Sequence, residues 1–167
     1  MPLKIADIIS GKKSSKLKQL RYDEMYLDIC TRISKMSFAK RAQVGALLVK
    51  DNNIISMGWN GTPIGFENDC EFRVDDFDED ALITKPEVLH AESNCITKVA
   101  KSTQSSIDST MYITISPCMD CAKLIAQSGI SRVVFKKFYR DKKSLDFLTK
   151  CGIIIDNYDF ESKKAFR

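Results

Sequence analysis

Four residues with the chemistry of a zinc site stand in two short motifs, His90-Ala91-Glu92 and Pro117-Cys118-Met119-Asp120-Cys121. His90 is the only histidine of the chain, and the two cysteines follow it after 28 and 31 residues. A structural zinc site closes with four protein ligands, whereas a catalytic site keeps one position for water. Three ligands and a nearby carboxylate therefore predict a catalytic zinc site formed by His90, Cys118 and Cys121.

The carboxylate of Glu92 suits a proton carrier better than a fourth ligand. Zinc bound by two thiolates and a neutral imidazole is formally neutral, so it should acidify water less than a site with three histidines. A neighbouring base is then needed, and Glu92 lies two residues from His90. The other interpretation is that Glu92 is simply an acid favoured in the first turn of a helix.

The spacing of the two cysteines places both thiols on one side of a helix. Cys118 and Cys121 are three residues apart, and Pro117 suits the first turn of the helix that they begin. His90 opens another helix, and the positive ends of both helices favour thiolate over thiol. A ribbon-type structural zinc site or a redox dithiol is the alternative, but the chain has no second Cys-x-x-Cys motif.

Composition indicates one globular domain of ordinary type. The 167 residues are 44% hydrophobic and 29% charged. The longest apolar runs are far shorter than the ~20 residues that a membrane-spanning helix needs. No signal-peptide pattern follows Met1, so we expect a cytoplasmic protein without a membrane partner.

The net charge of +4 is unevenly distributed. Basic residues dominate positions 4–21, which we interpret as a solvated end, with binding to a polyanion as the alternative. Residues 67–80 carry eight acidic side chains, and a solvated loop explains them better than a site for a hard cation. We therefore expect a basic N-terminal extension over 1–19 and a single domain over 20–167, with an irregular acidic insertion at about 61–89.

Hydrophobic periodicity predicts a layered α/β domain. Residues 1–15 read as irregular, and apolar residues then recur with helical spacing from about Leu20 to Met36. Further helices are expected at 90–101, 117–128 and 142–150, and strands at 44–50, 54–59, 110–116, 132–136 and 152–156. This order places helices on both faces of a central sheet.

The two motifs together resemble the signature of zinc-dependent nucleobase deaminases, and more closely that of deoxycytidylate (dCMP) deaminases of the bacterial and phage type. The matching stretches are Val44-Gly45-Ala46, Ser56 to Pro63, His90-Ala91-Glu92 and Ser116 to Ile130. The resemblance covers about residues 20–156. It implies the three-layer cytidine-deaminase fold, with a central five-stranded mixed sheet and helices on both faces.

The resemblance also implies a reaction. One Zn2+ per subunit is held by His90, Cys118 and Cys121, and Glu92 takes a proton from the activated water that attacks C4 of cytosine. Glu92 then delivers protons to N3 and to the leaving amino group. The products are dUMP and ammonia, and the dUMP feeds dTMP synthesis.

Substrate-binding residues are implied in the same way, namely Asn60, Tyr139, Ala91, Ser116 and Arg41. Tyr139 matches the family's base-stacking tyrosine, although it could simply pack with Phe138. The amide of Asn60 can donate to and accept from a deoxyribose hydroxyl, or Asn60 can be a turn residue that ends a strand. Arg41, with Lys40, could supply the cation for the phosphate, or both could be solvated surface.

The resemblance further implies regulation and assembly. In the family, the segment that here reads Gly58-Trp59-Asn60-Gly61 shapes an allosteric site for dCTP, an activator, and dTTP, an inhibitor, each with Mg2+. Tryptophan replaces the family's tyrosine, so stacking is kept and a hydroxyl is lost. A homo-oligomer is expected, most often a homohexamer.

Two other functions fit part of the pattern. A tRNA adenosine deaminase shares the zinc motif, and the basic N-terminal stretch would suit RNA. However, 29 residues separate Asn60 from His90, those editors have a much shorter link, and the acidic insertion would repel phosphate, so a nucleic-acid partner is not expected. The third possibility is a zinc-stabilised binding module without catalytic activity.

Overall fold

A six-stranded mixed sheet forms the centre of the computed structural model, which describes the backbone of residues 5–74, 81–139, 142–159 and 164–166. The strand order is β2-β1-β5-β6-β7-β8, with bounds Asn53–Trp59, Gly45–Lys50, Thr110–Ile115, Arg132–Lys137, Ile154–Asp159 and Lys164–Phe166. Strands β5, β6 and β7 are parallel, and the other neighbours are antiparallel. The five predicted strands are confirmed, and β8 adds a sixth at the edge beside β7.

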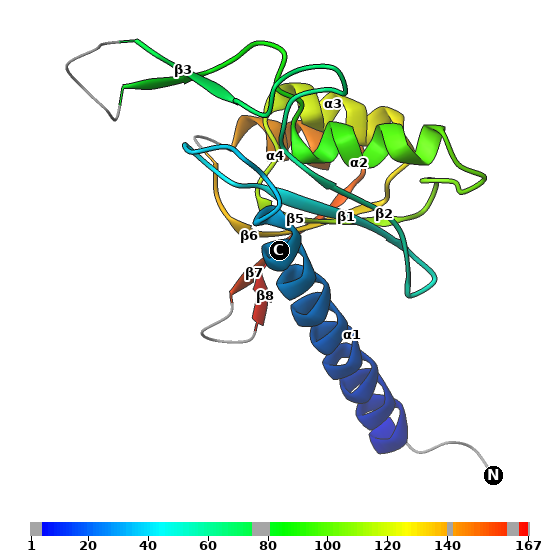
Figure 1. The fold of residues 1–167 in the computed structure, drawn as a ribbon. Coiled ribbons are helices and arrows are strands. Elements are labelled where there is room, and N and C mark those ends of the chain that lie inside the picture. Colours follow the sequence, from blue (N-terminus) through cyan, green and yellow to red (C-terminus); the bar gives the residue numbers. More distant parts are fainter. Residues whose placement is uncertain (1–4, 75–80, 140–141, 160–163, 167) are drawn as a thin grey trace.

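Helices cover both faces of this sheet, as the three-layer prediction requires (Figure 1). On one face lie α2 (Ala91–Ala100), α3 (Met119–Gln127) and α4 (Lys143–Lys150), and α1 (Ile5–Ser34) lies on the other. In the described part of the chain, no helix combines the length and apolar character needed to cross a membrane.

Alternating side chains of the central strands fill two separate cores, because successive residues of a strand point to opposite faces. The core under α2, α3 and α4 includes Ala46, Leu48, Met111, Ile113 and Val133. The core under α1 includes the intervening residues Leu47, Val49, Tyr112 and Val134. The sheet is therefore buried on both faces, which agrees with its continuous apolar strands.

The β1–β2 hairpin turns on Asp51 and Asn52. Both residues have positive φ angles, 49° and 61°. This is the conformation of the two-residue turn that matches the twist of paired strands, and Asp and Asn tolerate it better than most residues. An irregularity between Leu48 and Val49 then shifts the register of β2. The predicted hairpin is confirmed.

Helix α1 begins earlier than predicted. It starts at Ile5, so the expectation that residues 1–15 are irregular is wrong for the part that the structure describes. Ala6, Lys12 and Lys13 are good helix formers, and the cost of Gly11, about 1 kcal/mol, does not end a helix that continues on both sides. The division into an extension over 1–19 and a domain over 20–167 stays a prediction.

The insertion at 61–89 is less irregular than predicted. It contains a short hairpin of β3 (Glu71–Arg73) and β4 (Leu82–Thr84). A bridge between Gly61 and Leu89 closes the base of the insertion. Most of the acidic run, residues 75–80, lies outside the described residues.

A buried ion network fastens α1 to the sheet. Arg132 of β6 donates to both carboxylate oxygens of Asp23 at 2.8 Å and to Asp156 at 2.7 Å. Tyr112 of β5 also donates to Asp23, at 2.7 Å. Burial raises the pKa of Asp23, but the hydrogen bonds and charge of Arg132, with bonds from Gln19 and Tyr112, outweigh burial and lower it. The network therefore stabilises the fold above the unfolded pKa of Asp23 and loses this contribution as the pH falls through the lower folded pKa.

We expect Arg132→Met to lower the free energy of unfolding by about 3–5 kcal/mol, because Asp23 would remain buried without its cation. Urea denaturation at neutral pH and constant zinc measures this change. The control is Asp28→Asn, which removes an exposed ion pair with Lys136 and should cost less than about 1 kcal/mol. Equal effects of the two substitutions would contradict the interpretation.

Candidate active site

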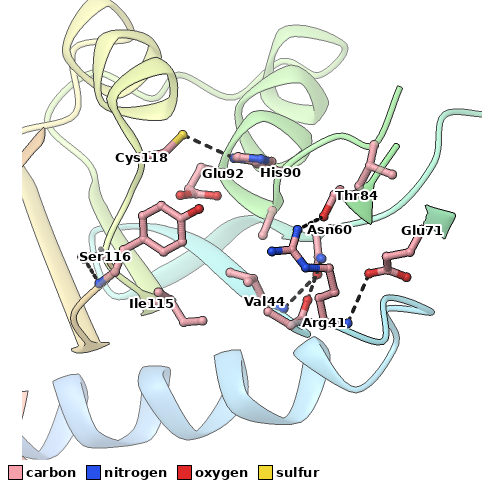
Figure 2. Close-up of a pocket in the computed structure, with 14 residues that line it drawn as sticks. Arg41, Val44, Asn60, Glu71, Thr84, His90, Glu92, Ile115, Ser116 and Cys118 are labelled. Atoms are coloured by element: carbon pink, nitrogen blue, oxygen red, sulfur yellow. Dashed lines mark hydrogen bonds between the residues drawn. The ribbon is translucent and has the colours of Figure 1, made fainter. Parts of the chain in front are cut away.

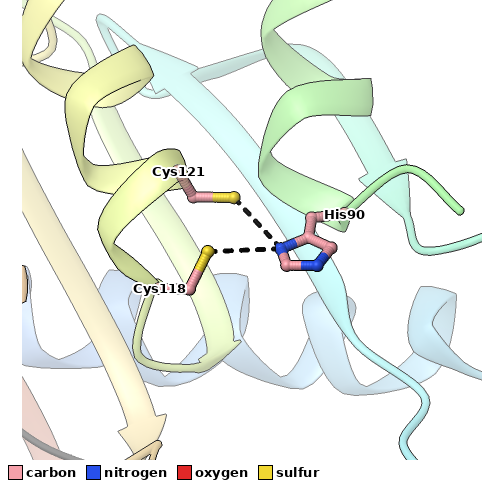
Figure 3. Close-up of side chains that lie close together, drawn as sticks. All are labelled: His90, Cys118 and Cys121. Carbon is pink, nitrogen blue, oxygen red and sulfur yellow. Dashed lines mark hydrogen bonds between the residues drawn. The ribbon is translucent and has the colours of Figure 1, made fainter. Parts of the chain in front are cut away.

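The predicted zinc ligands meet where the first turns of α2 and α3 converge (Figure 3). His90 is the residue that caps the N-terminus of α2, and Cys118 has the same position at α3. Nδ1 of His90 lies 3.4 Å from Sγ of Cys118 and 3.3 Å from Sγ of Cys121. Pro117 thus precedes the helix instead of lying in its first turn, because the helix begins one residue later than expected.

This geometry fits zinc. The three ligand atoms lie within 4.8 Å of one another, and they form the only such group among the described residues. Tetrahedral zinc has bonds of about 2.0–2.1 Å to nitrogen and 2.3 Å to sulfur. It therefore places a nitrogen ligand and a sulfur ligand about 3.6 Å apart. The observed separations of 3.3 and 3.4 Å are close to that value. A single ion can therefore bind all three side chains with little movement.

The ligand cluster holds one thiolate readily. Hydrogen bonds with Cys121 and His90 lower the pKa of Cys118 to about 4. The same hydrogen bond to Cys118, together with burial, raises the pKa of Cys121. The pKa of His90 is also raised, mainly by its hydrogen bond to Cys118. Zinc binding must therefore displace a proton from Cys121 and also requires neutral His90, which makes metal affinity depend on pH.

Glu92 lies beside the cluster, on the same helix as His90 but turned inward. Figure 2 shows its carboxylate next to His90 and Cys118, and its side chain is only 4% exposed. Burial raises the pKa of Glu92, and favourable interactions with His90 and Cys121 offset only part of this effect. A carboxylate whose pKa is raised toward neutrality is a stronger base and can also return the proton.

A cavity of about 310 Å3 opens in front of Glu92, within the usual size of small-molecule sites. Its described lining comprises Arg41, Ala42, Val44, Asn60, Glu71, Thr84, Val88, His90, Ala91, Glu92, Ile115, Ser116, Cys118 and Tyr139 (Figure 2). All the substrate-binding residues predicted from sequence therefore surround one cavity. Cys121, the third residue of the cluster, is not part of this lining.

The side chain of Asn60 joins the end of β2 to the segment before β1. Its Oδ1 accepts the N–H of Val44 at 2.8 Å, and its Nδ2 donates to the carbonyl of Ala42 at 2.8 Å. A carboxamide has two donors and two acceptor lone pairs, so one of each remains for a ligand. Asn60 therefore shapes the cavity and also presents polar atoms to it.

Ser116 positions the backbone of Tyr139. The hydroxyl of buried Ser116 accepts the N–H of Tyr139 at 2.7 Å, and the backbone N–H of Ser116 donates to the carbonyl of Lys137. Phe138 packs edge-on against Phe135, with ring centroids 5.0 Å apart. The ring of Phe138 therefore packs against Phe135, whereas Tyr139 lines the cavity.

Six lining residues were not predicted from the sequence, namely the polar Glu71 and Thr84 and the apolar Ala42, Val44, Val88 and Ile115. Glu71 accepts the backbone N–H groups of Lys40 and Arg41, and Thr84 accepts a hydrogen bond from the side chain of Arg41. Glu71 belongs to the acidic stretch that was expected to be solvated, yet it is 4% exposed, so that expectation is wrong for this residue. No motif or periodicity singles out Glu71 or Thr84.

The segment from Gly58 to Gly61 has clear packing roles. A side chain at Gly58 would collide with the backbone of α2 at Ala91 and Cys95, so only glycine permits this close contact. The carbonyl of Trp59 accepts a hydrogen bond from Asn94, and its ring lies 4.6 Å from Nζ of Lys98. Of the four residues, only Asn60 belongs to the described cavity lining.

Comparison with known proteins connects this geometry to one family. Residues 20–137 match the family model described as the cytidine and deoxycytidylate deaminase zinc-binding region. The chain belongs to this deaminase family. Its members include the deoxycytidylate deaminase of Enterobacteria phage T4, 33% identical over 78% of this chain and 86% of the phage protein. The human deoxycytidylate deaminase is 36% identical over 84% of this chain and 87% of the relative.

Solved structures agree with the family assignment. The dCMP deaminase of cyanophage S-TIM5, crystallised with dCMP and dUMP, is 41% identical and superposes with a TM-score of 0.74 over 80% of this chain and 94% of the other. A bifunctional deaminase-reductase of Thermotoga maritima, 21% identical with a TM-score of 0.62, shares the fold. The chain is therefore a zinc-type deaminase, which excludes the alternative of a module without catalytic activity.

We expect Cys118→Ser to reduce the zinc content of the purified deaminase from about one ion per chain to near zero, because one of three protein ligands is lost. Elemental analysis of the protein measures this ratio. The matched control is Cys151→Ser, which changes an exposed cysteine away from the cluster and should retain the metal. Full zinc content in Cys118→Ser would rule out this cluster as the zinc site.

Proposed function

We propose that this deaminase converts dCMP to dUMP and ammonia by hydrolysis, in the supply of dUMP for dTMP synthesis. The observation that carries the proposal is the buried carboxylate of Glu92, which lies beside the His90, Cys118 and Cys121 cluster and lines a cavity of about 310 Å3. The relative crystallised with dCMP and dUMP supports the choice of substrate.

In this proposal Glu92 carries the protons. Zinc, when bound, supplies a water that is easier to deprotonate. Glu92 accepts a proton from this water. Burial raises the pKa of Glu92, which makes the carboxylate a stronger base. Glu92 gives this proton to N3 of the cytosine as the hydroxide adds to C4. It then takes the remaining proton of the former water from the C4 hydroxyl and gives it to the amino group, which departs as ammonia. The carboxylate ends the cycle in its starting state.

The remaining cavity residues hold the substrate. Asn60 offers its free amide donor and acceptor to the deoxyribose hydroxyl, and the ring of Tyr139 stacks on the base. Ala91 and Ser116 complete the lining around the base. Arg41, at the mouth of the cavity, binds the phosphate with its guanidinium group.

We expect Glu92→Gln to keep its zinc and to lose dCMP turnover by about 10²–10⁴-fold, because the amide cannot carry the proton. Ammonia release from dCMP, measured beside zinc content, tests both parts.

Deoxycytidine and a tRNA anticodon stem-loop are assayed in parallel with the wild-type enzyme. Formation of inosine within the RNA, without turnover of dCMP, would favour the tRNA adenosine deaminase instead.

Regulation is part of the proposal. The enzyme is activated by dCTP and inhibited by dTTP, each bound with Mg2+ at the segment Gly58-Trp59-Asn60-Gly61, within a homohexamer. Asn60 supports this coupling, because it belongs to the segment and its side chain also binds the cavity wall at Val44 and Ala42. A ligand that shifts Asn60 would alter the cavity.

Trp59 provides a direct test, since it is the only tryptophan of the chain. We expect dTTP with Mg2+ to change the intrinsic fluorescence and to move the dCMP saturation curve to higher concentrations. Trp59→Ala should lose the response to both effectors. Unchanged saturation curves at millimolar dTTP and dCTP would exclude regulation at this segment.

A further inference from the structure

The β3–β4 hairpin holds one side of the cavity through Glu71. The carboxylate of Glu71 accepts the N–H of Lys40 at 3.1 Å with each oxygen, and that of Arg41 at 3.2 Å. A buried carboxylate is unfavourable unless hydrogen bonds satisfy it. These contacts satisfy Glu71 and fix the segment before β1 to β3 (Figure 2).

Thr84, directly opposite Glu71 in the hairpin register, holds the side chain of the same arginine. Its Oγ1 accepts a hydrogen bond of 2.9 Å from Nη1 of Arg41. One cross-strand pair therefore fixes both the backbone and the guanidinium of Arg41. This arrangement limits the rotamers that Arg41 can adopt at the cavity.

The charge of Arg41 is left available by this arrangement. Thr84 is neutral, and Glu71 binds the backbone of Arg41, so no described carboxylate forms an ion pair with the guanidinium. Arg41 is also the only lysine or arginine in the described lining of the cavity. A guanidinium has five N–H donors in a planar fork that matches two oxygens of a phosphate.

We infer that the β3–β4 hairpin is a phosphate-recognition element, in which Glu71 and Thr84 are positioning residues that hold Arg41 ready for the 5′-phosphate of the nucleotide. This inference rests on the proposed function and deepens it. The insertion then makes the enzyme select nucleotides over nucleosides, although it carries none of the residues that act on the base.

Two variants separate positioning from catalysis. We expect Glu71→Gln to raise the KM for dCMP about 10-fold, because its amide donor opposes the N–H groups of Lys40 and Arg41. Thr84→Val, which keeps the shape and removes the acceptor, should raise the KM in the same direction. The kcat should change less than about twofold, because the phosphate is bound equally in the ground and transition states. The kcat/KM for deoxycytidine, which lacks the phosphate, should not change.

Titration calorimetry with dUMP and deoxyuridine measures the same selectivity without turnover. Both variants should bind dUMP more weakly and deoxyuridine as the wild-type enzyme does. The control is Glu67→Gln, an exposed acid of the same insertion, which should leave both affinities unchanged. Circular dichroism and thermal denaturation of each variant establish that the fold is retained.

Several results would overturn the inference. They are unchanged dUMP affinity in both variants, equal losses for dUMP and deoxyuridine, or tighter dUMP binding in Glu71→Gln, which would mean that Glu71 competes with the phosphate. Absence of dCMP turnover by the wild-type enzyme would instead contradict the proposed function, and the two binding titrations would still decide the role of the hairpin.

Discussion

The close approach of α2 to β2 is the constraint on which the site depends. Gly58 leaves no side chain where β2 passes the first turn of α2, so the helix can lie directly on the strand. Polar side chains of α2 then bind the carbonyl groups of β2, with Asn94 at Trp59 and Lys98 at Met57. These contacts fix the orientation of α2 and its distance from the sheet. They thereby determine where the N-terminus of α2 meets the N-terminus of α3.

This placement separates the tasks of two residues that are neighbours in the chain. His90 ends the extended segment and reaches the sulfur atoms of Cys118 and Cys121 at the N-terminal end of the helix. Glu92, one half-turn later, is turned toward the sheet and is buried. In the proposed function, a ligand and a proton carrier can therefore lie side by side without competing for the metal, because the helix directs them to different surroundings.

Much of this arrangement is predictable from local patterns. Short apolar runs bounded by turn residues predict the five strands, and the motifs that contain His90, Cys118 and Cys121 predict the ligand cluster. The part played by Glu71 was not predictable, because its acidic neighbours look the same in composition and only the fold places its carboxylate under Lys40 and Arg41. The early start of α1 was missed because Gly11, Ser14 and Ser15 are weak helix formers, although Ile5, Ile8 and Ile9 recur with helical spacing.

The length of α1 affects how the molecule moves in solution. Thirty residues at about 1.5 Å each give a rod of about 45 Å, roughly three times the radius of gyration of a compact domain of this size. Figure 1 shows that its first half extends well beyond the sheet. Friction depends on shape as well as mass, so the protein should diffuse and tumble more slowly than a sphere of equal mass. A subunit number taken from elution volume alone would be too large, whereas light scattering or sedimentation equilibrium would report the mass itself.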